Sequence, residues 1–238
     1  MRIVAIFLLV AMAQTAGEAS VFHWTTRLLH MNCDTHTVTR GHNPELVPRS
    51  GQADQVTAQD FAAERPFSAG TKLTLGVCNG EVHILPGGDA GKLKITVHLA
   101  APLGHERTPQ SYLQIFAFDD KGADIEWKLP EAGHPVVTVY LPEHADLDLE
   151  LGKAELDVTG IRGNKHLSLG KGTARLHVAS GNSEYSRMTV DVAMGSFRDW
   201  RPDGLESHKV PLHQEFLGTG SASARIEVAM GKAEIAPE

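Results

Sequence analysis

The stretch Leu147–Val158 reads LDLELGKAELDV and consists of two alternating runs on either side of a glycine. In the first run every second residue is a leucine, and the residues between the leucines are Asp148 and Glu150. Period-two alternation of this kind is typical of a β-strand with one apolar face. A glycine between two such runs favours a corner, because glycine adopts a positive φ at little cost. The stretch therefore predicts two short strands that meet at Gly152.

The same template occurs three more times in the C-terminal half of the chain. The further copies are HLSLGKGTARLHV (His166–Val178), MTVDVAMGSFRDW (Met188–Trp200) and RIEVAMGKAEI (Arg225–Ile235), with pivot glycines Gly170, Gly195 and Gly231. One copy cannot bury its apolar face alone, whereas stacked copies make a continuous core. The sequence therefore predicts an all-β fold, a β-solenoid-like stack of short strands with glycine corners. An antiparallel β-sandwich is the alternative, because it uses the same alternation.

Stacking the copies in register places equivalent residues in columns. The inward column is expected to hold Leu149, Leu167, Val190 and Ile226, and the outward column Asp148, His166, Thr189 and Arg225. In a solenoid, residues 147–151 pair with residues 166–169 in parallel, whereas a meander makes neighbouring strands antiparallel. The direction of this pairing therefore separates the two architectures.

The alternating pattern begins near Phe67 and is interrupted at about residues 100–135. The interruption holds two strand-like runs, Tyr112–Phe118 and Ala123–Leu129, joined by the turn sequence DDKG. We expect an inserted β-hairpin within a β-repeat domain that spans residues 67–238. Residues 20–66 are polar and lack sustained periodicity, so we expect a mostly irregular N-terminal segment there.

The N-terminus has the features of a secretory signal peptide. Arg2 precedes an uninterrupted apolar stretch, Ile3–Ala13, and Gly17 and Ala19 occupy the −3 and −1 positions of a cleavage site before Ser20. A retained membrane anchor is the alternative, but a spanning helix needs about 20 apolar residues. We expect residues 1–19 to be removed and the protein to be exported, to the periplasm, the outer surface or the medium, with no membrane span after cleavage.

The chain beyond the signal sequence contains two cysteines, Cys33 and Cys78. In an oxidising compartment an even pair predicts a disulfide, and the alternative is two unpaired buried thiols. Closing so long a loop stabilises a fold by about 4 kcal/mol in the chain-entropy description. Such a bridge would tie the polar N-terminal segment to the first well-defined strand.

Composition argues against several classes of function. The net charge is −7, with acidic and basic residues interspersed, so the basic face that nucleic-acid binding needs is not expected. The sequence contains no G-x-S-x-G, P-loop or dinucleotide-binding motif. We therefore expect no enzymatic activity, no catalytic residue and no cofactor.

Two groups of residues raise the question of a metal. Cys33, His36 and His42 are of the types that bind zinc, but their spacing matches no recognised site and a disulfide would consume the sulfur. Asp119, Asp120 and Asp124 lie around Gly122 in the hairpin turn, without the ligand order of a calcium loop. We favour surface histidines and a polar turn, and we expect no metal site.

A polysaccharide-active β-helix is the main enzymatic alternative. Glycosidic bond cleavage needs two carboxylates about 5–10 Å apart, and stacked strands lie about 4.8 Å apart. The candidate carboxylates are Glu155, Asp157 and Asp191, and the candidate sugar-stacking aromatics are Trp127, Tyr185, Phe197 and Trp200. Because every outward face of a solenoid carries carboxylates, we favour a solvated strand face over an active site.

Three segments resemble the DUF4097 family of bacterial exported or envelope proteins, whose family label is adhesin. They are Leu73–Leu85 (LTLGVCNGEVHIL), Val137–Val158 (VTVYLPEHADLDLELGKAELDV) and the glycine repeats that follow, together covering about residues 67–100 and 136–238. The resemblance implies a β-solenoid-like domain, an envelope setting and no established catalysis. It assigns no site residues.

These observations lead to three hypotheses about function. We favour a non-catalytic exported envelope scaffold or adhesin-like binding module, whose partner is an unknown envelope polymer or protein. The alternatives are the polysaccharide-active enzyme and a structural protein that self-associates through its exposed terminal strands.

Overall fold

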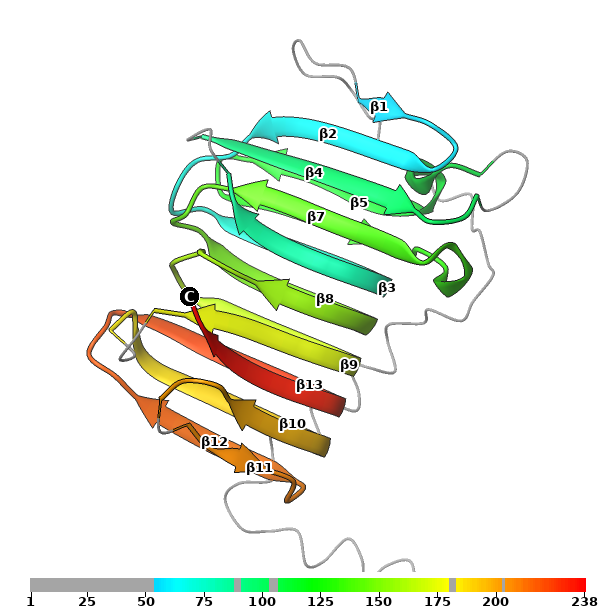
Figure 1. Cartoon of the computed structure of the whole chain (residues 1–238). Helices are drawn as coiled ribbons and strands as arrows, with labels where there is room; N and C mark the ends of the chain where they lie inside the picture. Colours follow the sequence, from blue (N-terminus) through cyan, green and yellow to red (C-terminus); the bar gives the residue numbers. More distant parts are fainter. Residues whose placement is uncertain (1–53, 88–90, 103–106, 180–182, 203) are drawn as a thin grey trace, which may run out of the picture. The chain divides into compact units, whose positions relative to one another are not determined.

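The computed structural model describes residues 54–87, 91–102, 107–179, 183–202 and 204–238. In these ranges the regular structure is β, apart from two short 3-10 helices, and the all-β prediction is confirmed (Figure 1). The elements are β1 (Gln55–Val56), β2 (Asp60–Pro66), β3 (Lys72–Pro86), β4 (Lys92–Leu99), η1 (Pro109–Tyr112), β5 (Leu113–Asp119), β6 (Gly122–Trp127), η2 (Glu131–Gly133), β7 (Pro135–Leu141), β8 (Asp146–Val158), β9 (Lys165–Val178), β10 (Tyr185–Asp199), β11 (Glu206–Ser207), β12 (Leu212–Leu217) and β13 (Ala222–Pro237).

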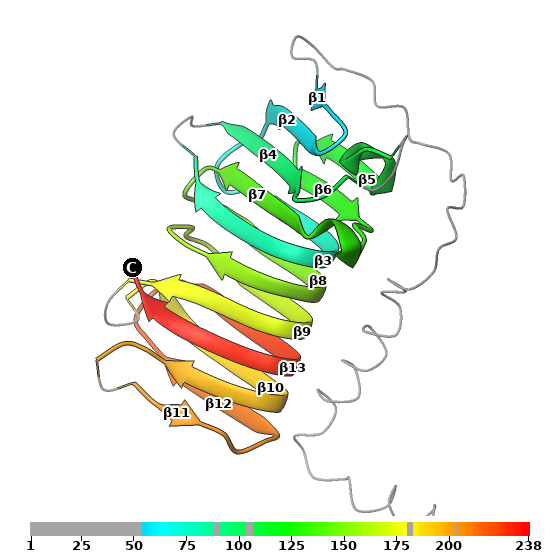
Figure 2. The same ribbon diagram turned by 45° about the vertical axis from the view of Figure 1, so that its right-hand side comes forward.

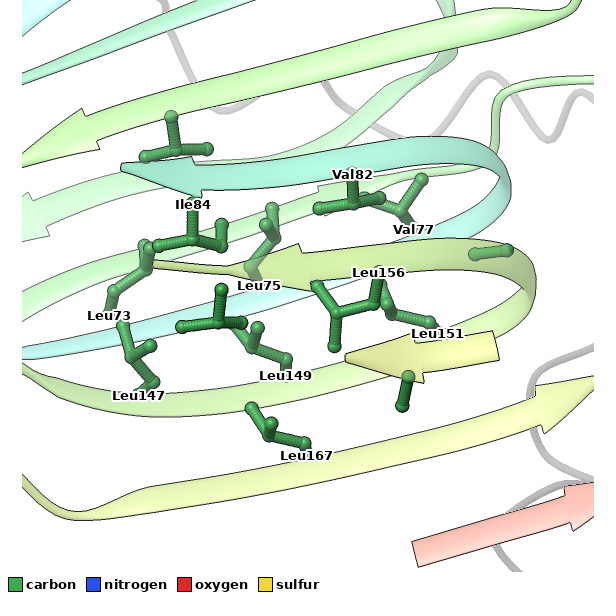
Figure 3. Packing of buried hydrophobic residues seen from close by; sticks show 14 of the residues in the cluster. Leu73, Leu75, Val77, Val82, Ile84, Leu147, Leu149, Leu151, Leu156 and Leu167 are labelled. Carbon is green, nitrogen blue, oxygen red and sulfur yellow. The ribbon is translucent and has the colours of Figure 1, made fainter. Parts of the chain in front are cut away.

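Five long strands, β3, β8, β9, β10 and β13, bend in the middle and contribute to two layers. Residues 72–77 of β3 pair with β6, whereas residues 81–86 of the same strand pair with β7. At the other end of the stack, residues 187–192 of β10 pair with β12, and residues 197–198 pair with β11. We call the layer of the first halves the first layer and that of the second halves the second layer. Apolar side chains of both halves fill the space between the layers, as Figure 3 shows for β3 and β8.

The five bent strands are parallel and in register, in the order β3-β8-β9-β13-β10. Leu149 lies beside Leu167, Leu167 beside Ile226, and Ile226 beside Val190, and all four are buried. The outward column of Asp148, His166, Arg225 and Thr189 also forms in register. The parallel pairing of β8 with β9 therefore confirms the solenoid-like stack rather than the antiparallel sandwich.

The spatial order of the stack departs from the order of the sequence. The last strand, β13, lies between β9 and β10 (Figures 1 and 2). The chain leaves β10, adds β11 and β12 along the far side of that strand, and then returns to fill the place beside β9. The C-terminal strand is therefore paired on both sides.

The corner that joins the two layers depends on glycine at Gly172, Gly231 and Gly195. At Gly172 φ is +133°, and a Cβ atom would lie 1.8 Å from the carbonyl oxygen of Ala154 in the neighbouring strand. The same contact recurs along the stack, because a Cβ at Gly231 would lie 1.9 Å from the carbonyl oxygen of Gly172. In β8 and β9 this corner lies two residues after the predicted pivots, Gly152 and Gly170.

Additional strands extend both layers at the β3 end of the stack. The second layer continues antiparallel through β4 and β2 beyond β7, and the first layer continues through the hairpin of β6 and β5. The hairpin strands turn at Asp119–Gly122, within the interruption of the repeat pattern. Strand β2 falls in the segment for which the sequence predicted mostly irregular structure.

Candidate binding surfaces

The outer face of the first layer carries a ladder of paired charges that starts at β3. The ammonium group of Lys72 lies 2.7 Å from Oδ2 of Asp148, and Oδ1 of Asp148 lies 3.0 Å from Nδ1 of His166. The other ring nitrogen of His166 lies 3.2 Å from Oε2 of Glu227. The hydrogen bond with Glu227, with a further contribution from Asp148, outweighs partial burial and raises the pKa of His166. Burial of Asp148 opposes its ionisation, but hydrogen bonds from Lys72 and His166 prevail and lower its pKa.

The ladder continues across the remaining strands of the first layer. Arg225 lies 2.5 Å from Oε1 of Glu227 and 3.5 Å from Oδ2 of Asp191. Asp191 in turn lies 2.6 Å from Nδ1 of His213 on β12. The five inner groups of the ladder, Asp148, His166, Glu227, Arg225 and Asp191, each contact two neighbours, which restricts the positions of their charges.

A second ladder lies on the outer face of the second layer. Arg175 on β9 lies opposite Asp157 on β8 and contacts its Oδ2 at 3.6 Å. On its other side Arg175 donates two hydrogen bonds to Oε2 of Glu234, at 2.8 and 2.6 Å. This contact with Glu234 is the main cause of the raised pKa of Arg175. Both outer faces of the stack are therefore covered by cross-strand ion pairs, as expected for charges aligned in register.

A depression of about 310 Å³ lies at the corner, between η2 and strands β3, β8 and β9. Its lining includes Gly80, Ala154 and Gly172 together with the polar residues Lys153, Lys171, Glu131 and His134. Lys153 and Lys171 are direct neighbours in the β8–β9 pairing. Glu131 accepts a hydrogen bond from Lys153, and this bond, followed by the charges of Lys153, His134 and Lys171, lowers the pKa of Glu131. The site combines two adjacent ammonium groups with a carboxylate that is bound to one of them.

Sequence reasoning missed this depression. Stacking the copies already places Lys153 beside Lys171 and predicts that part of the site. Glu131 and His134 belong to the interruption of the repeat, and only the folded chain brings them to the corner.

The structure divides the carboxylates proposed for polysaccharide cleavage between the two outer faces of the stack. Glu155 and Asp157 belong to the second layer, whereas Asp191 belongs to the first layer and faces the opposite side of the molecule. Of the candidate aromatics, Trp127, Tyr185 and Phe197 are buried in the core, and Trp200 is 46% exposed. The guanidinium carbon of Arg198 lies 3.5 Å from the ring centroid of Trp200. Of the four candidate aromatics, Trp200 is therefore the one exposed to solvent.

Of the two groups of metal candidates, one lies in the described part of the chain and the other lies outside it. Asp119 accepts backbone hydrogen bonds from Lys121 and Gly122 at 2.8 and 3.0 Å, which stabilises the hairpin turn. Among the described residues there is no cluster of three or more His, Cys, Asp and Glu side chains able to hold a metal ion. Residues Cys33, His36 and His42 lie outside them, as do the predicted signal sequence and cleavage site.

Cys78 is buried on β3, at the start of the corner. Its predicted partner, Cys33, lies outside the described residues, so the bridge stays a prediction. No helix in the described part of the chain is long and apolar enough to cross a membrane.

Comparison with known proteins identifies a distant structural neighbour. No family model matches the sequence, and no curated protein matches it. A solved structure, described as that of a "putative cell adhesion protein" from Clostridium sporogenes, matches 77% of this chain and 100% of its own, at 12% identity and a TM-score of 0.44.

Proposed function

We propose that this protein is a non-catalytic binding and scaffold module of the cell envelope, of the kind that the resemblance to DUF4097 implies. One observation carries the proposal: five bent strands stack in register and display ladders of paired charges on both outer faces. Neighbouring strands are about 4.8 Å apart, so each face is a rigid array of regularly spaced polar groups. Such an array suits contact with an extended polymer better than conversion of a small substrate.

The corner depression is the proposed point of contact, and an acidic glycan is the proposed ligand. Lys153 and Lys171 offer two adjacent cationic groups, and in the free protein Glu131 occupies one of them. A carboxylate of the glycan replaces Glu131 at Lys153 and pairs with Lys171. Charge-assisted hydrogen bonds of this kind are about twice as strong as neutral ones. The volume of about 310 Å³ accommodates roughly one or two sugar units, at the small end of known ligand sites.

Glycan-array binding of the chain without residues 1–19 tests this proposal. We expect the protein to retain acidic polysaccharides in preference to neutral ones, and the double variant Lys153→Ala/Lys171→Ala to lose most of that binding. Lys94→Ala is the matched control, because Lys94 is an exposed lysine on β4, outside the depression. Equal binding of neutral and acidic glycans, or equal binding by the double variant, would contradict the proposal.

The same samples test the proposed lack of catalysis. Incubation with each retained polysaccharide should release no new reducing ends over many hours. Release of reducing ends that Asp157→Asn or Asp191→Asn abolishes would support the polysaccharide-active enzyme instead.

Export and the disulfide have separate tests. N-terminal sequencing of protein from its native host should find a mature chain that begins near Ser20, and an intact Met1 in the cytosolic fraction would exclude export by this route.

If Cys33 and Cys78 are bridged, thiol titration of the unfolded, unreduced protein should find no free thiol. Two free thiols would rule the bridge out.

A further inference from the structure

The first layer ends in an open edge at β12. This strand pairs with β10 on one side, and no other described strand pairs with it. An unpaired edge presents a row of backbone N–H and C=O groups to solvent and is a template for another strand. Figures 1 and 2 show β12 and β11 together at this end of the stack.

The exposed apolar side chains of the described residues gather towards the same end. The large apolar residues that are exposed are Val56, Met194, Trp200, Leu205, Val210, Leu217 and Met230. All but Val56 lie between residues 194 and 230, and Leu217, at the end of β12, is 71% exposed. In addition, Leu212 and Phe216 pack against the core but are only partly buried, and no further strand of the described ranges pairs with β12 to cover them. The core of the stack is therefore incompletely closed at β12.

The sequence of β12 is complementary to itself in one antiparallel register. With Gln214 opposite Gln214 of a second copy, Leu212 lies opposite Phe216 of the second copy, and both face the core. On the outer face, His213 then lies opposite Glu215 of the second copy, which is an attractive pairing. Moving the centre to Glu215 would place two carboxylates opposite each other, and moving it to His213 would place Leu212 opposite Gln214. Apolar residues meet apolar residues, and the imidazole of His213 meets the carboxylate of Glu215, only when Gln214 is at the centre.

We propose that β12 docks antiparallel against β12 of a second copy, around a two-fold axis at Gln214. The first layers of two molecules then form one continuous sheet, and each copy covers Leu212 and Phe216 of the other. The contact is isologous and closes on itself, so it yields a dimer and not a filament. This inference goes beyond the proposed function, and it does not depend on any glycan.

Cysteine cross-linking of the full chain without residues 1–19 tests the register. Residues directly opposite each other in an antiparallel pair have Cα atoms about 4.5 or 5.5 Å apart, within the range that a disulfide spans. We therefore expect Gln214→Cys to form a covalent dimer under mild oxidation, with a 214–214 linkage found by peptide mass spectrometry. Leu217→Cys is the matched control. Residue 217 is more exposed than residue 214, but in this register it lies opposite residue 211 of the second copy and far from residue 217 of that copy. Cross-linking of Leu217→Cys in preference to Gln214→Cys would overturn the register.

Sedimentation of the unmodified protein tests the association itself. We expect a monomer–dimer equilibrium, and we expect Gln214→Lys, which places two ammonium groups at the axis, to weaken it at least tenfold. Its unfolding midpoint at low concentration should remain close to that of the parent, which shows that the loss is not misfolding. A monomer at all concentrations, or open-ended oligomers that Gln214→Lys does not affect, would refute the proposal. Because glycan binding is measured separately on the same variants, failure of one proposal leaves the other standing.

Discussion

The two ends of the stack are closed in different ways. At the β3 end, Phe61 of β2 reaches across the core to Trp127 of β6, with ring centroids 5.2 Å apart in an edge-to-face arrangement. Phe61 and Trp127 are 1% and 0% exposed, and the indole N–H of Trp127 donates to the carbonyl oxygen of Pro109 at 3.1 Å. Phe116 completes the cluster, and the guanidinium group of Arg65 lies over its ring. Strands from both layers thus seal this end with large aromatic side chains.

At the β12 end, the aromatic side chain of Phe216 on β12 lies at the edge of the core. Phe216 contacts Phe197 at a centroid distance of 5.9 Å, and Arg201 lies over its outer side at 5.5 Å. Phe216 itself is only partly buried, and Leu217 next to it is exposed. A stack of repeats needs a cap wherever its core would otherwise meet water. Among the described strands, therefore, the β3 end is sealed by large aromatic side chains and the β12 end is not; in the dimer proposed above, the second copy completes that end.

The largest expected effect is loss of the aromatic cap. Truncating Trp127 to alanine removes a fully buried side chain and should lower the free energy of unfolding by about 3–5 kcal/mol. Phe216→Ala removes a partly buried ring and should cost about 1 kcal/mol at concentrations where the protein is monomeric. Chemical denaturation of both variants at low protein concentration measures the difference. Equal losses would mean that the β12 end is closed as tightly as the β3 end.

A smaller loss in the free energy of unfolding is expected from a substitution at the glycine corner, where neighbouring strands of the stack lie in register. A side chain at Gly172 would meet the carbonyl oxygen of Ala154 at 1.8 Å and would also need a positive φ, so Gly172→Ala should cost about 3 kcal/mol. Gly70 is the matched control, since its φ is +80° and nothing lies within 4 Å of an added Cβ. Gly70→Ala should then cost only the conformational strain, about 1–2 kcal/mol. If thermal and chemical unfolding find the two variants alike, close stacking at the corner is not what holds the rungs in register.

The sequence predicted the interior of the stack well because the interior repeats. The inward column of Leu149, Leu167, Val190 and Ile226 and its outward neighbours follow from period-two alternation and a shared register, which are local properties of the chain. The same argument placed the corner two residues early in β8 and β9. In β8 the two competing positions are Gly152 and Ala154, whereas in β9 both are glycines, Gly170 and Gly172. Stereochemistry decides between them: Gly172 has the positive φ.

The ends and the order of the strands were not predictable in the same way. Insertion of β13 between β9 and β10 depends on long-range pairing, which leaves no periodic signal. In β2, the inward residues are Phe61 and Ala63, so one half of the apolar pattern is a small side chain that does not stand out in sequence. The binding depression needs residues from η2, whose position is set by the fold and not by the repeat.

The smallest expected effect concerns the ladder between the two ends. His166 belongs to the outward column, yet its side chain is partly buried and bridges Asp148 and Glu227. Because the hydrogen bond with Glu227 raises the pKa of His166 above the ordinary value of 6.5, the protonated ring stabilises the fold fully below pH 6.5, and this stabilisation is lost as the pH rises through the folded-state pKa. His166→Gln should therefore cost roughly 1 kcal/mol in mildly acidic buffer and clearly less in alkaline buffer.

Parallel denaturation series over this pH range, with His98→Gln as the control, measure the effect. His98 also pairs with a carboxylate, Asp60, at 2.7 Å, but its side chain is 58% exposed at the β3 end. Exposed ion pairs contribute about 0–1 kcal/mol, so His98→Gln should change stability little at any pH. A cost of His166→Gln that grows with pH would show that the neutral ring, and not the imidazolium, is the form that the ladder holds. The carboxylates Asp148 and Glu227 would then have to be satisfied mainly by Lys72 and Arg225, and the ladder would act as two separate ion pairs flanking the histidine.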